Sequence, residues 1–466
     1  MSKGEHYYKE TFTQMKSLVE PHSIAVIGAS SNIKKVGGAI TRNALEAYFR
    51  GQIYLVNPKA KKIMGRKVYP NLEAVPDNIE LLEIVVPASL VPIIMEQAVE
   101  KGVKGVIIIS SGFAEVGRRD LQGEVDRIAK KGGIRVIGPN CFGIINTEMG
   151  LDLSFTFSKP LKGSIAFVSQ SGALCCGTLD WAYIEEVGFS KFINLGNKCD
   201  IDEADVLVYL EKDRQTKVIA IYIEGIRDGR KLFEVMKKVS KKKPIIVLKS
   251  GLTKPGSRAA LSHTGSIAGH AEIFKAATRQ AGAILVNDIE ELFDSIQVFS
   301  QPRSLGKNAA ILSNAGGLAV LTADWCDKLG LVVSKFPSKT VEKLQSFLPP
   351  IASPNNPVDM TGIADYNSYK KVLETILKVE TIDLIISIFV SQGLVTSDGP
   401  ARAVVEMQKI SDKPLLAYWM GGNSILNGVR ILKRGGVPVY SSPERVARAA
   451  AKLVIQLARS RARLAY

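Results

Sequence analysis

His263 is the residue whose type and surroundings could carry covalent chemistry. It lies in the polar, glycine-containing segment 257–266, after an apolar run at Ile245–Leu248. A neutral imidazole is nucleophilic near pH 7, because its reference pKa is about 6.5, so it can accept a phosphoryl group and pass it on. A carboxylate on the other ring nitrogen would fix the tautomer, and Glu224, at the end of an apolar strand, is the candidate. Taken alone, the pattern also fits a structural loop histidine, which is the commoner case.

Two short Ser/Gly turns, 169–172 and 313–316, each stand between an apolar strand and a helix. Free N–H groups at a helix start favour a negative ligand, and one helix end contributes about 0.3–1 kcal/mol, or up to about 2 kcal/mol when partly buried. Two such ends could hold a transferring phosphoryl group. The alternative for each turn is an ordinary helix start with small residues for close packing.

A third glycine turn, Gly28–Ser31, follows the first apolar strand. Such a turn brings backbone N–H groups close to a phosphate at the carboxyl end of a doubly wound sheet. The nicotinamide fingerprint GxGxxG is absent, because Ser30 and Ile33 stand where glycines are required. The second strand is followed by Lys59 instead of an acidic residue for a ribose, which suits a phosphate-bearing ligand. A purely structural turn remains the alternative.

The elements that must position these residues are short apolar strands alternating with amphipathic helices, a pattern that predicts parallel sheets with crossover helices. Strands are expected at 24–27, 53–56, 81–86, 105–109, 135–137 and 164–168, with an aperiodic linker at 151–163. A segment with Pro and Gly at 301–307 indicates another boundary. We therefore predict three α/β domains, at 1–150, 151–303 and 304–466.

The second and third domains share an internal repeat. With an offset of 144 residues, the stretch that begins at Ser164 aligns with the one that begins at Asn308. Ser169 meets Ser313, Gly172 meets Gly316, and later segments such as Lys243-Pro244 and Lys413-Pro414 echo each other. The repeat predicts two related flavodoxin-like units.

Composition limits the class of protein. The chain has 466 residues, 46% hydrophobic and 23% charged, a balance typical of soluble globular proteins. Its net charge of +16 favours anionic ligands. Nucleic acid is not expected, because no RNP-type aromatic run, zinc-finger spacing or long basic block is present.

The cysteines and the first residues of the chain indicate the cellular compartment in which the protein is expected. Five cysteines without a C-x-x-C pair argue against a disulfide framework and a zinc site, and no metal site is expected. The polar start MSKGEHYYKE is no signal peptide, and the longest apolar run, 81–95, is too short and broken to cross a bilayer. A cytoplasmic protein without membrane contact is expected.

With these motifs, the chain resembles the α subunit of archaeal-type ADP-forming acetyl-CoA synthetases, in the superfamily that includes succinyl-CoA synthetase. The most specific likeness is 260–269, ALSHTGSIAG, which resembles the family's phosphohistidine loop; 138–143 and 356–362 are also typical. The resemblance implies an N-terminal Rossmann-like CoA-binding domain followed by two flavodoxin-like doubly wound domains. It also implies that two helices present their N-termini to the phosphohistidine.

Site residues follow from the resemblance by position. Catalysis is assigned to His263 and Glu224. The phosphoryl group is expected to contact Ser169, Gln170, Ser171, Gly172, Ala173, Asn314, Ala315, Gly316 and Gly317. CoA is expected to face Gly28, Ala29, Ser30, Lys35, Lys59, Val86, Pro87, Ser110, Gly112 and Asn140.

The implied reaction is acyl-CoA + ADP + phosphate ⇌ carboxylate + CoA + ATP, with acetyl-CoA as the first substrate to consider. Because no ATP-grasp domain is recognisable, a β subunit is expected to bind ADP or ATP and Mg²⁺, in an α2β2 assembly. Three alternatives stay open: a succinyl-, aryl- or hydroxyacyl-CoA synthetase subunit, a CoA-binding regulatory protein without turnover, and a basic nucleic-acid-binding protein.

Overall fold

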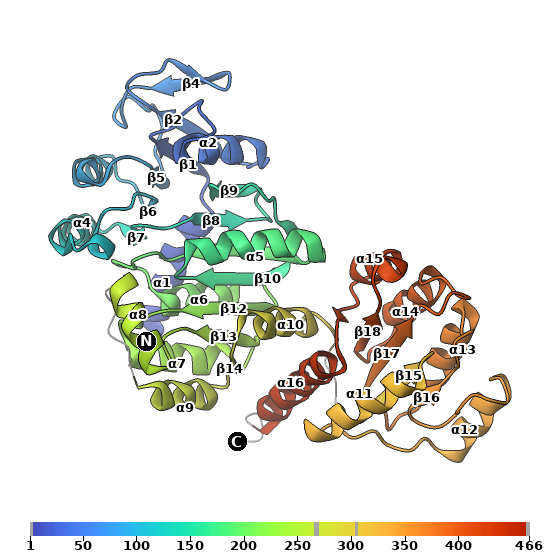
Figure 1. Ribbon diagram of the computed structural model, residues 1–466. Coiled ribbons are helices and arrows are strands. Elements are labelled where there is room, and N and C mark those ends of the chain that lie inside the picture. Colours follow the sequence, from blue (N-terminus) through green and yellow to red (C-terminus); the bar gives the residue numbers. More distant parts are fainter. Residues whose placement is uncertain (1–2, 265–269, 303–305, 463–466) are drawn as a thin grey trace. The chain divides into compact units, whose positions relative to one another are not determined.

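The computed structural model describes the backbone of residues 3–264, 270–302 and 306–462, and the side chains of residues 5–259, 270–302 and 306–455 (Figure 1). The chain forms two compact units, Met1–Asp288 (unit 1) and Ile289–Tyr466 (unit 2). Unit 1 contains two seven-stranded sheets and unit 2 contains one five-stranded sheet. None of the described helices is long and apolar enough to cross a lipid bilayer.

The first sheet of unit 1 has the strand order β3-β4-β2-β1-β5-β6-β7. Its strands are β1 (Ser23–Ile27), β2 (Gln52–Val56), β3 (Lys62–Ile63), β4 (Arg66–Tyr69), β5 (Leu81–Ile84), β6 (Gly105–Ile108) and β7 (Arg135–Ile137). All neighbours pair in parallel except β3 with β4, so the parallel strands follow the Rossmann order 3-2-1-4-5-6. The predicted Rossmann-like fold is confirmed.

Helix α1 (Lys3–Val19) precedes the first strand of this sheet, and the other helices of this part of the chain connect its parallel strands. These are α2 (Val36–Glu46), α3 (Val91–Glu100) and α4 (Arg119–Gly132), with short 3₁₀ turns η1 (Ala88–Leu90) and η2 (Ala114–Val116). Helix α4 ends where Gly133 adopts a φ of +65°, a left-handed conformation that glycine reaches without a Cβ penalty.

The second sheet of unit 1 has the order β14-β13-β12-β10-β11-β8-β9. Its strands are β8 (Gly143–Asn146), β9 (Leu151–Ser154), β10 (Leu161–Ser169), β11 (Gly188–Asn194), β12 (Val218–Ile223), β13 (Ile245–Lys249) and β14 (Ile284–Val286). Its helices are α5 (Gly172–Glu185), α6 (Glu203–Lys212), α7 (Gly229–Val239), α8 (Lys254–Thr264) and α9 (Ala271–Ala281).

The prediction that residues 151–163 form an irregular linker is wrong, because this segment contains β9 and the start of β10. Strand β9 pairs antiparallel with β8, and β8 pairs antiparallel with β11. A four-residue strand whose pairing partners lie elsewhere in the chain leaves no periodic signal of its own. The predicted boundary at 150 stays a prediction, although β8 joins the second sheet before that position.

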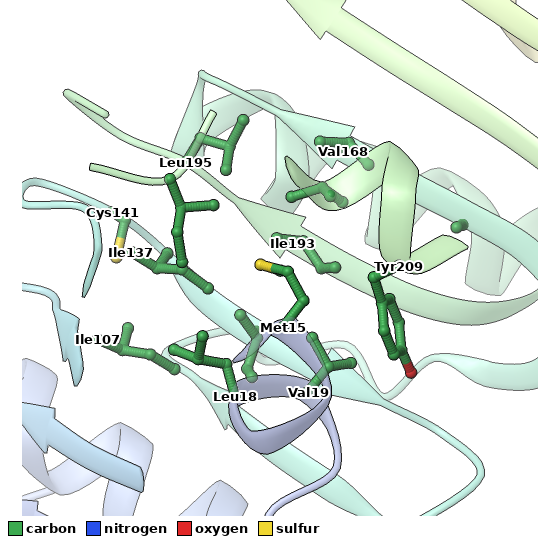
Figure 2. Close-up of a cluster of buried hydrophobic side chains, with 14 of the residues drawn as sticks. Met15, Leu18, Val19, Ile107, Ile137, Cys141, Val168, Ile193, Leu195 and Tyr209 are labelled. Carbon is green, nitrogen blue, oxygen red and sulfur yellow. The ribbon is translucent and has the colours of Figure 1, made fainter. Parts of the chain in front are cut away.

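Helix α1 packs in a hydrophobic cluster shared by the two sheets of unit 1. Figure 2 shows Met15, Leu18 and Val19 of α1 facing side chains from β6, β7, β10, β11 and α6. All three α1 side chains are fully buried. Tyr7 and Tyr209 extend the contact with hydrogen bonds to Asp205 (2.8 Å) and Glu20 (2.7 Å).

Unit 2 contains one parallel sheet with the order β16-β15-β17-β18-β19. Its strands are β15 (Ala309–Ser313), β16 (Val358–Asp359), β17 (Leu384–Val390), β18 (Leu415–Met420) and β19 (Val439–Tyr440). Its helices are α10 (Ile289–Phe299), α11 (Gly316–Lys328), α12 (Ser338–Gln345), α13 (Tyr366–Ile376), α14 (Asp398–Ile410), η3 (Asn423–Ile425), α15 (Leu426–Arg434) and α16 (Pro443–Ala462).

The repeat read from the sequence is a repeat of topology. In chain order, the parallel strands of the second and third sheets both follow the flavodoxin order 2-1-3-4-5. Even the echoed lysines have the same role, because Lys243 Nζ donates to the carbonyls of Leu210 and Asp213 and Lys413 Nζ donates to those of Leu377 and Val379. The prediction of two flavodoxin-like units is confirmed.

Candidate functional site

The turn after β1 is tight enough to require glycine. Gly28 has a φ of +91°, and a Cβ there would lie 2.1 Å from the Val85 carbonyl oxygen. A Cβ on Gly37, in the first turn of α2, would lie 2.2 Å from the Gly28 carbonyl oxygen. The start of α2 is therefore pressed against the strand end, the arrangement that exposes backbone N–H groups to an anion.

The ends of β1 and β2 are tied together by Asn57, a residue that the sequence analysis did not single out. Its Nδ2 donates to the Ala29 carbonyl at 2.8 Å, and its Oδ1 accepts from the N–H of Lys59 at 2.8 Å. Ser30 Oγ accepts from the N–H of Asn32 at 3.1 Å. Lys59 and Lys35, the two cations predicted for CoA, are both exposed at this edge.

The ends of β5 and β6 meet through Ser110. Its hydroxyl accepts from the Val86 N–H at 3.2 Å and donates to the Val86 carbonyl, beside the exposed Pro87. The Ser110 carbonyl accepts from the N–H of Asn140 at 2.9 Å, which draws the end of β7 to the same place. The predicted CoA residues after β5, β6 and β7 are therefore neighbours.

Glu115 already satisfies the N–H of Gly112, which the sequence analysis assigned to CoA. Its carboxylate accepts from Gly112 at 2.5 Å and from Asn197 Nδ2 at 2.5 Å. Burial raises the pKa of Glu115, but the hydrogen bonds from Asn197 and Gly112 outweigh this and hold the pKa below its ordinary value. Gly112 thus serves the fold of this loop, and no local motif pointed to Glu115.

A cleft of about 380 Å³ lies between η2, the start of α4 and the loop after β11. Its lining residues are Ala114, Arg119, Gln122, Gly123, Asp126, Asn197, Lys198, Cys199 and Arg227. None of the residues predicted for CoA or phosphate lines it.

The turn between β10 and α5, residues 169–172, is called the α5 turn. Ser169 Oγ accepts from the N–H of Ser171 at 3.0 Å and donates to its carbonyl at 2.9 Å. Ser171 caps the helix by accepting from the N–H of Leu174 at 3.3 Å. Among the described residues, the N–H groups of Gly172 and Ala173 have no partner, so they are available to an anion.

Gln170 connects the α5 turn to Glu224. Its Oε1 accepts from the N–H groups of Glu224 and Gly225, the latter at 2.8 Å, and its Nε2 donates to the Gly225 carbonyl at 3.2 Å. The Gln170 side chain was predicted to touch phosphate, but all of these bonds hold the loop after β12. Glu224 itself is half-buried beside that loop.

Lys249 is a cation near Glu224 that the sequence analysis missed. Its Nζ donates to the Glu224 carbonyl at 2.8 Å. Burial lowers the pKa of Lys249, while the charge of Glu224 raises it. Tyr222 lies on the neighbouring strand β12, just before Glu224. Burial raises the pKa of Tyr222 and the charge of Glu224 raises it further, although a hydrogen bond to Ser250 lowers it. A buried cation at the end of β13 adds positive potential to this edge.

His263 lies near the end of α8, and its side chain is outside the described residues, as are Gly265 and Gly269. The helix start is held by Thr253, whose Oγ1 accepts from Gly256 at 3.2 Å and whose carbonyl accepts from Ser257 at 2.7 Å. Helix α8 contacts η2. The helix that carries His263 therefore lies beside the loop of Gly112, and the distance from the imidazole to Glu224 stays a prediction.

The turn between β15 and α11, residues 313–316, is called the α11 turn. It repeats the serine bonds of the α5 turn, although Ala315 offers no side-chain cap where Ser171 does. Ser313 Oγ accepts from the N–H of Ala315 at 2.9 Å and donates to its carbonyl at 2.9 Å. Asn314 takes the place of Gln170 by exchanging two hydrogen bonds of 2.8 Å with Val390 at the end of β17. Within the described residues, the N–H groups of Gly316 and Gly317 donate to nothing.

Three family models match the chain in succession. They are a CoA binding domain at residues 22–147, a succinyl-CoA ligase like flavodoxin domain at 162–299 and a ligase-CoA domain at 309–465. The α subunit of acetate–CoA ligase [ADP-forming] II from Pyrococcus furiosus is 44% identical over 445 residues, covering 94% of this chain and 96% of the relative. The chain belongs to the ADP-forming acetate–CoA ligase family.

Other members of the ADP-forming acetate–CoA ligase family differ in length. Acetate–CoA ligase [ADP-forming] I of Archaeoglobus fulgidus is 41% identical over 93% of this chain, which spans only 62% of that relative. The solved structure of Candidatus Korarchaeum cryptofilum acetyl-coenzyme A synthetase 1 with phosphate and ADP matches with a TM-score of 0.91 and 36% identity, covering 96% of this chain and 97% of that one.

Proposed function

We propose that this chain is the α subunit of an ADP-forming acyl-CoA synthetase, with acetyl-CoA as its thioester substrate. The observation that carries the proposal is the duplicated Ser/Gly turn, which offers two free N–H groups at the start of α5 and again at the start of α11. Such N–H groups can stabilise the negative charge of a phosphoryl group while it passes from one molecule to another. The 44% identical relative from Pyrococcus furiosus is named as the α subunit of an acetate–CoA ligase [ADP-forming], which agrees with this chemistry.

The proposed chemistry has three transfers. A phosphate oxygen attacks the thioester carbonyl, the C–S bond breaks, and CoA leaves as the thiol after taking a proton. An imidazole nitrogen of His263 then attacks phosphorus, and the P–O bond to the carboxylate breaks. The phosphoryl group finally passes to ADP. Glu224 orients the ring and stabilises the charged phosphohistidine.

The edge formed by the ends of β1, β2, β5, β6 and β7 is proposed to bind CoA. Its glycine turn at Gly28 and the exposed cations Lys35 and Lys59 suit the phosphates of CoA. Ser110 and Asn140 would contact the rest of the molecule from the neighbouring strand ends.

A second subunit completes the proposed enzyme. An ATP-grasp β subunit would bind ADP and Mg²⁺, in an α2β2 assembly in the cytoplasm. The name of the Pyrococcus relative, which calls that chain a subunit alpha, supports a partner of this kind. Among the described residues, no group of three or more His, Cys, Asp or Glu side chains comes together as a metal site.

The test is phosphorylation of the complex with its β subunit by radioactive phosphate in the presence of acetyl-CoA. We expect an acid-labile, alkali-stable label on wild-type protein and none on His263→Ala. His270→Ala is the matched control, because His270 begins α9 and its side chain caps nothing there.

Absence of label from the wild-type complex would leave a CoA-binding protein without turnover. Label that persists in His263→Ala would assign the phosphoryl group to another residue. A survey of acetyl-, succinyl-, aryl- and hydroxyacyl-CoA thioesters with the same complex then decides the acyl specificity, and faster turnover of any thioester other than acetyl-CoA would correct the proposed substrate.

A further inference from the structure

The two turns differ in charge at one equivalent position. In the paired strands, Ser169 stands opposite Asn194 of β11, and Ser313 stands opposite Asp359 of β16. The following residues make the same bond, because Leu195 N–H donates to Ser169 and Met360 N–H donates to Ser313, both at 2.8 Å. An amide beside α5 is therefore replaced by a carboxylate beside α11.

Asn194 is neutral and fully buried, and its side-chain amide is hydrogen-bonded to the backbone. Its Nδ2 donates to the Ser169 carbonyl at 2.7 Å, and its Oδ1 accepts from the Phe142 N–H at 2.5 Å. A Cβ on Gly172 would lie 3.6 Å from that Oδ1. The start of α5 thus has a polar neighbour without a net charge.

Asp359 approaches the other helix start more closely. A Cβ on Gly316 would lie 2.4 Å from Asp359 Oδ2, so the carboxylate is in contact with the glycine. Its Oδ1 accepts from the Thr361 N–H at 3.0 Å, which fixes the group in this place. The partial positive charge at the start of α11 is therefore partly neutralised before any ligand arrives.

We propose that Asp359 makes the α11 turn the weaker of the two phosphoryl sites, so that an anion occupies the α5 turn first. This inference rests on the proposed function and names a specificity-determining residue for it. A unit charge in contact with an anion site near a protein surface changes affinity by about tenfold or more.

The test uses the full chain labelled with ¹⁵N-glycine and titrated with inorganic phosphate, following the amide signals of Gly172 and Gly316. In the wild type, Gly172 should respond at a lower phosphate concentration than Gly316. In Asp359→Asn, the midpoint for Gly316 should fall about tenfold, while that for Gly172 stays unchanged. A midpoint for Gly316 that is unchanged or raised, or no response of Gly316 at any phosphate concentration, overturns the inference.

Asp365→Asn is the matched charge control. Asp365 begins α13 in the same loop and caps it by accepting from the Ser368 N–H at 2.9 Å, a role that asparagine also fills. This variant should leave both midpoints unchanged. The reciprocal Asn194→Asp, with folding checked by circular dichroism, should raise the midpoint for Gly172.

Labelling of His263 separates this inference from the proposed function. A labelled His263 with an unchanged Gly316 midpoint in Asp359→Asn rejects only the inference. An unlabelled His263 with the expected midpoint shift rejects the phosphohistidine and leaves the ranking of the two turns intact.

Discussion

Glu83 illustrates how much a single residue of this chain can depend on its surroundings. It lies in the middle of β5, is fully buried, and neither carboxyl oxygen has a partner among the described residues. Burial, followed by the charge of Asp152, holds the pKa of Glu83 well above its ordinary value. Burial also raises the pKa of Asp152 to about 6, although bonds from Ser154 lower it. Glu83 therefore keeps its proton in the folded chain to a higher pH than an exposed glutamate does.

Glu83→Gln should change how stability depends on pH. The folded chain keeps the Glu83 proton to a higher pH than the unfolded chain, so the wild type loses stability as pH rises above about 4.5 until the folded group ionises. The free energy of unfolding of Glu83→Gln, measured from pH 5 upward, should therefore gain on that of the wild type by up to about 1.4 kcal/mol per pH unit, until the folded Glu83 ionises. Glu96→Gln, an exposed control on α3, should follow the wild type. Parallel pH dependences of the unfolding free energy for Glu83→Gln and wild type would show that Glu83 ionises in the fold.

The positions of candidate site residues were predictable only where a local sequence pattern indicated them. Gly28, Lys59 and the two Ser/Gly turns stand next to strand ends, which an apolar run followed by small or charged residues indicates. Glu115, Asn57 and Gln170 act across the fold, on partners up to 82 residues away in the case of Glu115. Pairings over such distances depend on sheet order, which one sequence does not specify.

At the scale of elements, one amide side chain in each flavodoxin-like domain joins the Ser/Gly turn to the end of a strand that lies adjacent in the sheet. Gln170 bonds to the loop after β12, and Asn314 bonds to the end of β17. Both side chains are buried. The sequence offset of 144 thus records a shared hydrogen-bond pattern as well as shared strands.

Gln170→Leu should loosen the loop of Glu224 without disturbing unit 2. The N–H groups of Glu224 and Gly225 would lose their acceptor, at a cost of about 1–3 kcal/mol for each group left buried and unpaired. Hydrogen–deuterium exchange read by mass spectrometry should accelerate at 224–225 and stay unchanged at 390–392. Asn314→Leu is the matched variant and should show the reverse pattern. If either variant accelerated amide exchange equally at 224–225 and at 390–392, the two amide side chains would not act independently.

Most strands of the parallel sheets were predictable, because runs such as Ile245–Leu248 and Ile24–Ile27 are apolar and bounded by turn residues. The antiparallel pair β8 and β9 was not, since its few residues gain their strand character from β11. The short β3, with only two residues, likewise depends on β4 for its definition.

At the scale of the whole molecule, the division between the two units falls before α10, whereas the predicted boundary at 303 falls after it. Helix α10 packs on α16 within unit 2. Arg445 donates to both carboxyl oxygens of Asp294, at 2.9 and 2.6 Å, and Lys452 pairs with Glu291. The boundary at 303 stays a prediction, and the contacts of α10 offer a way to test it.

Asp294→Asn should weaken the packing of α10 on α16, because the Arg445 guanidinium loses its buried charged partner and keeps only the exposed Glu290. We expect a loss of about 2 kcal/mol in unit 2, smaller than the 3–5 kcal/mol typical of a fully buried pair. Amide exchange should accelerate in α10 and α16 and stay unchanged in unit 1. Glu290→Gln is the control, because Glu290 pairs with the same Arg445 at 2.8 Å but is largely exposed. Acceleration in the second sheet of unit 1 instead would support the boundary at 303.

The position of α1 has a consequence for biosynthesis. This helix is synthesised long before its partners, because Tyr7 bonds to Asp205, which lies 198 residues later in the chain. At about 5–20 residues per second, Met15, Leu18 and Val19 wait roughly 10–40 seconds before their full hydrophobic environment exists. During that interval the apolar face of α1 is exposed on the nascent chain. A chaperone that binds this face would be needed only until α6 has been synthesised and can cover it.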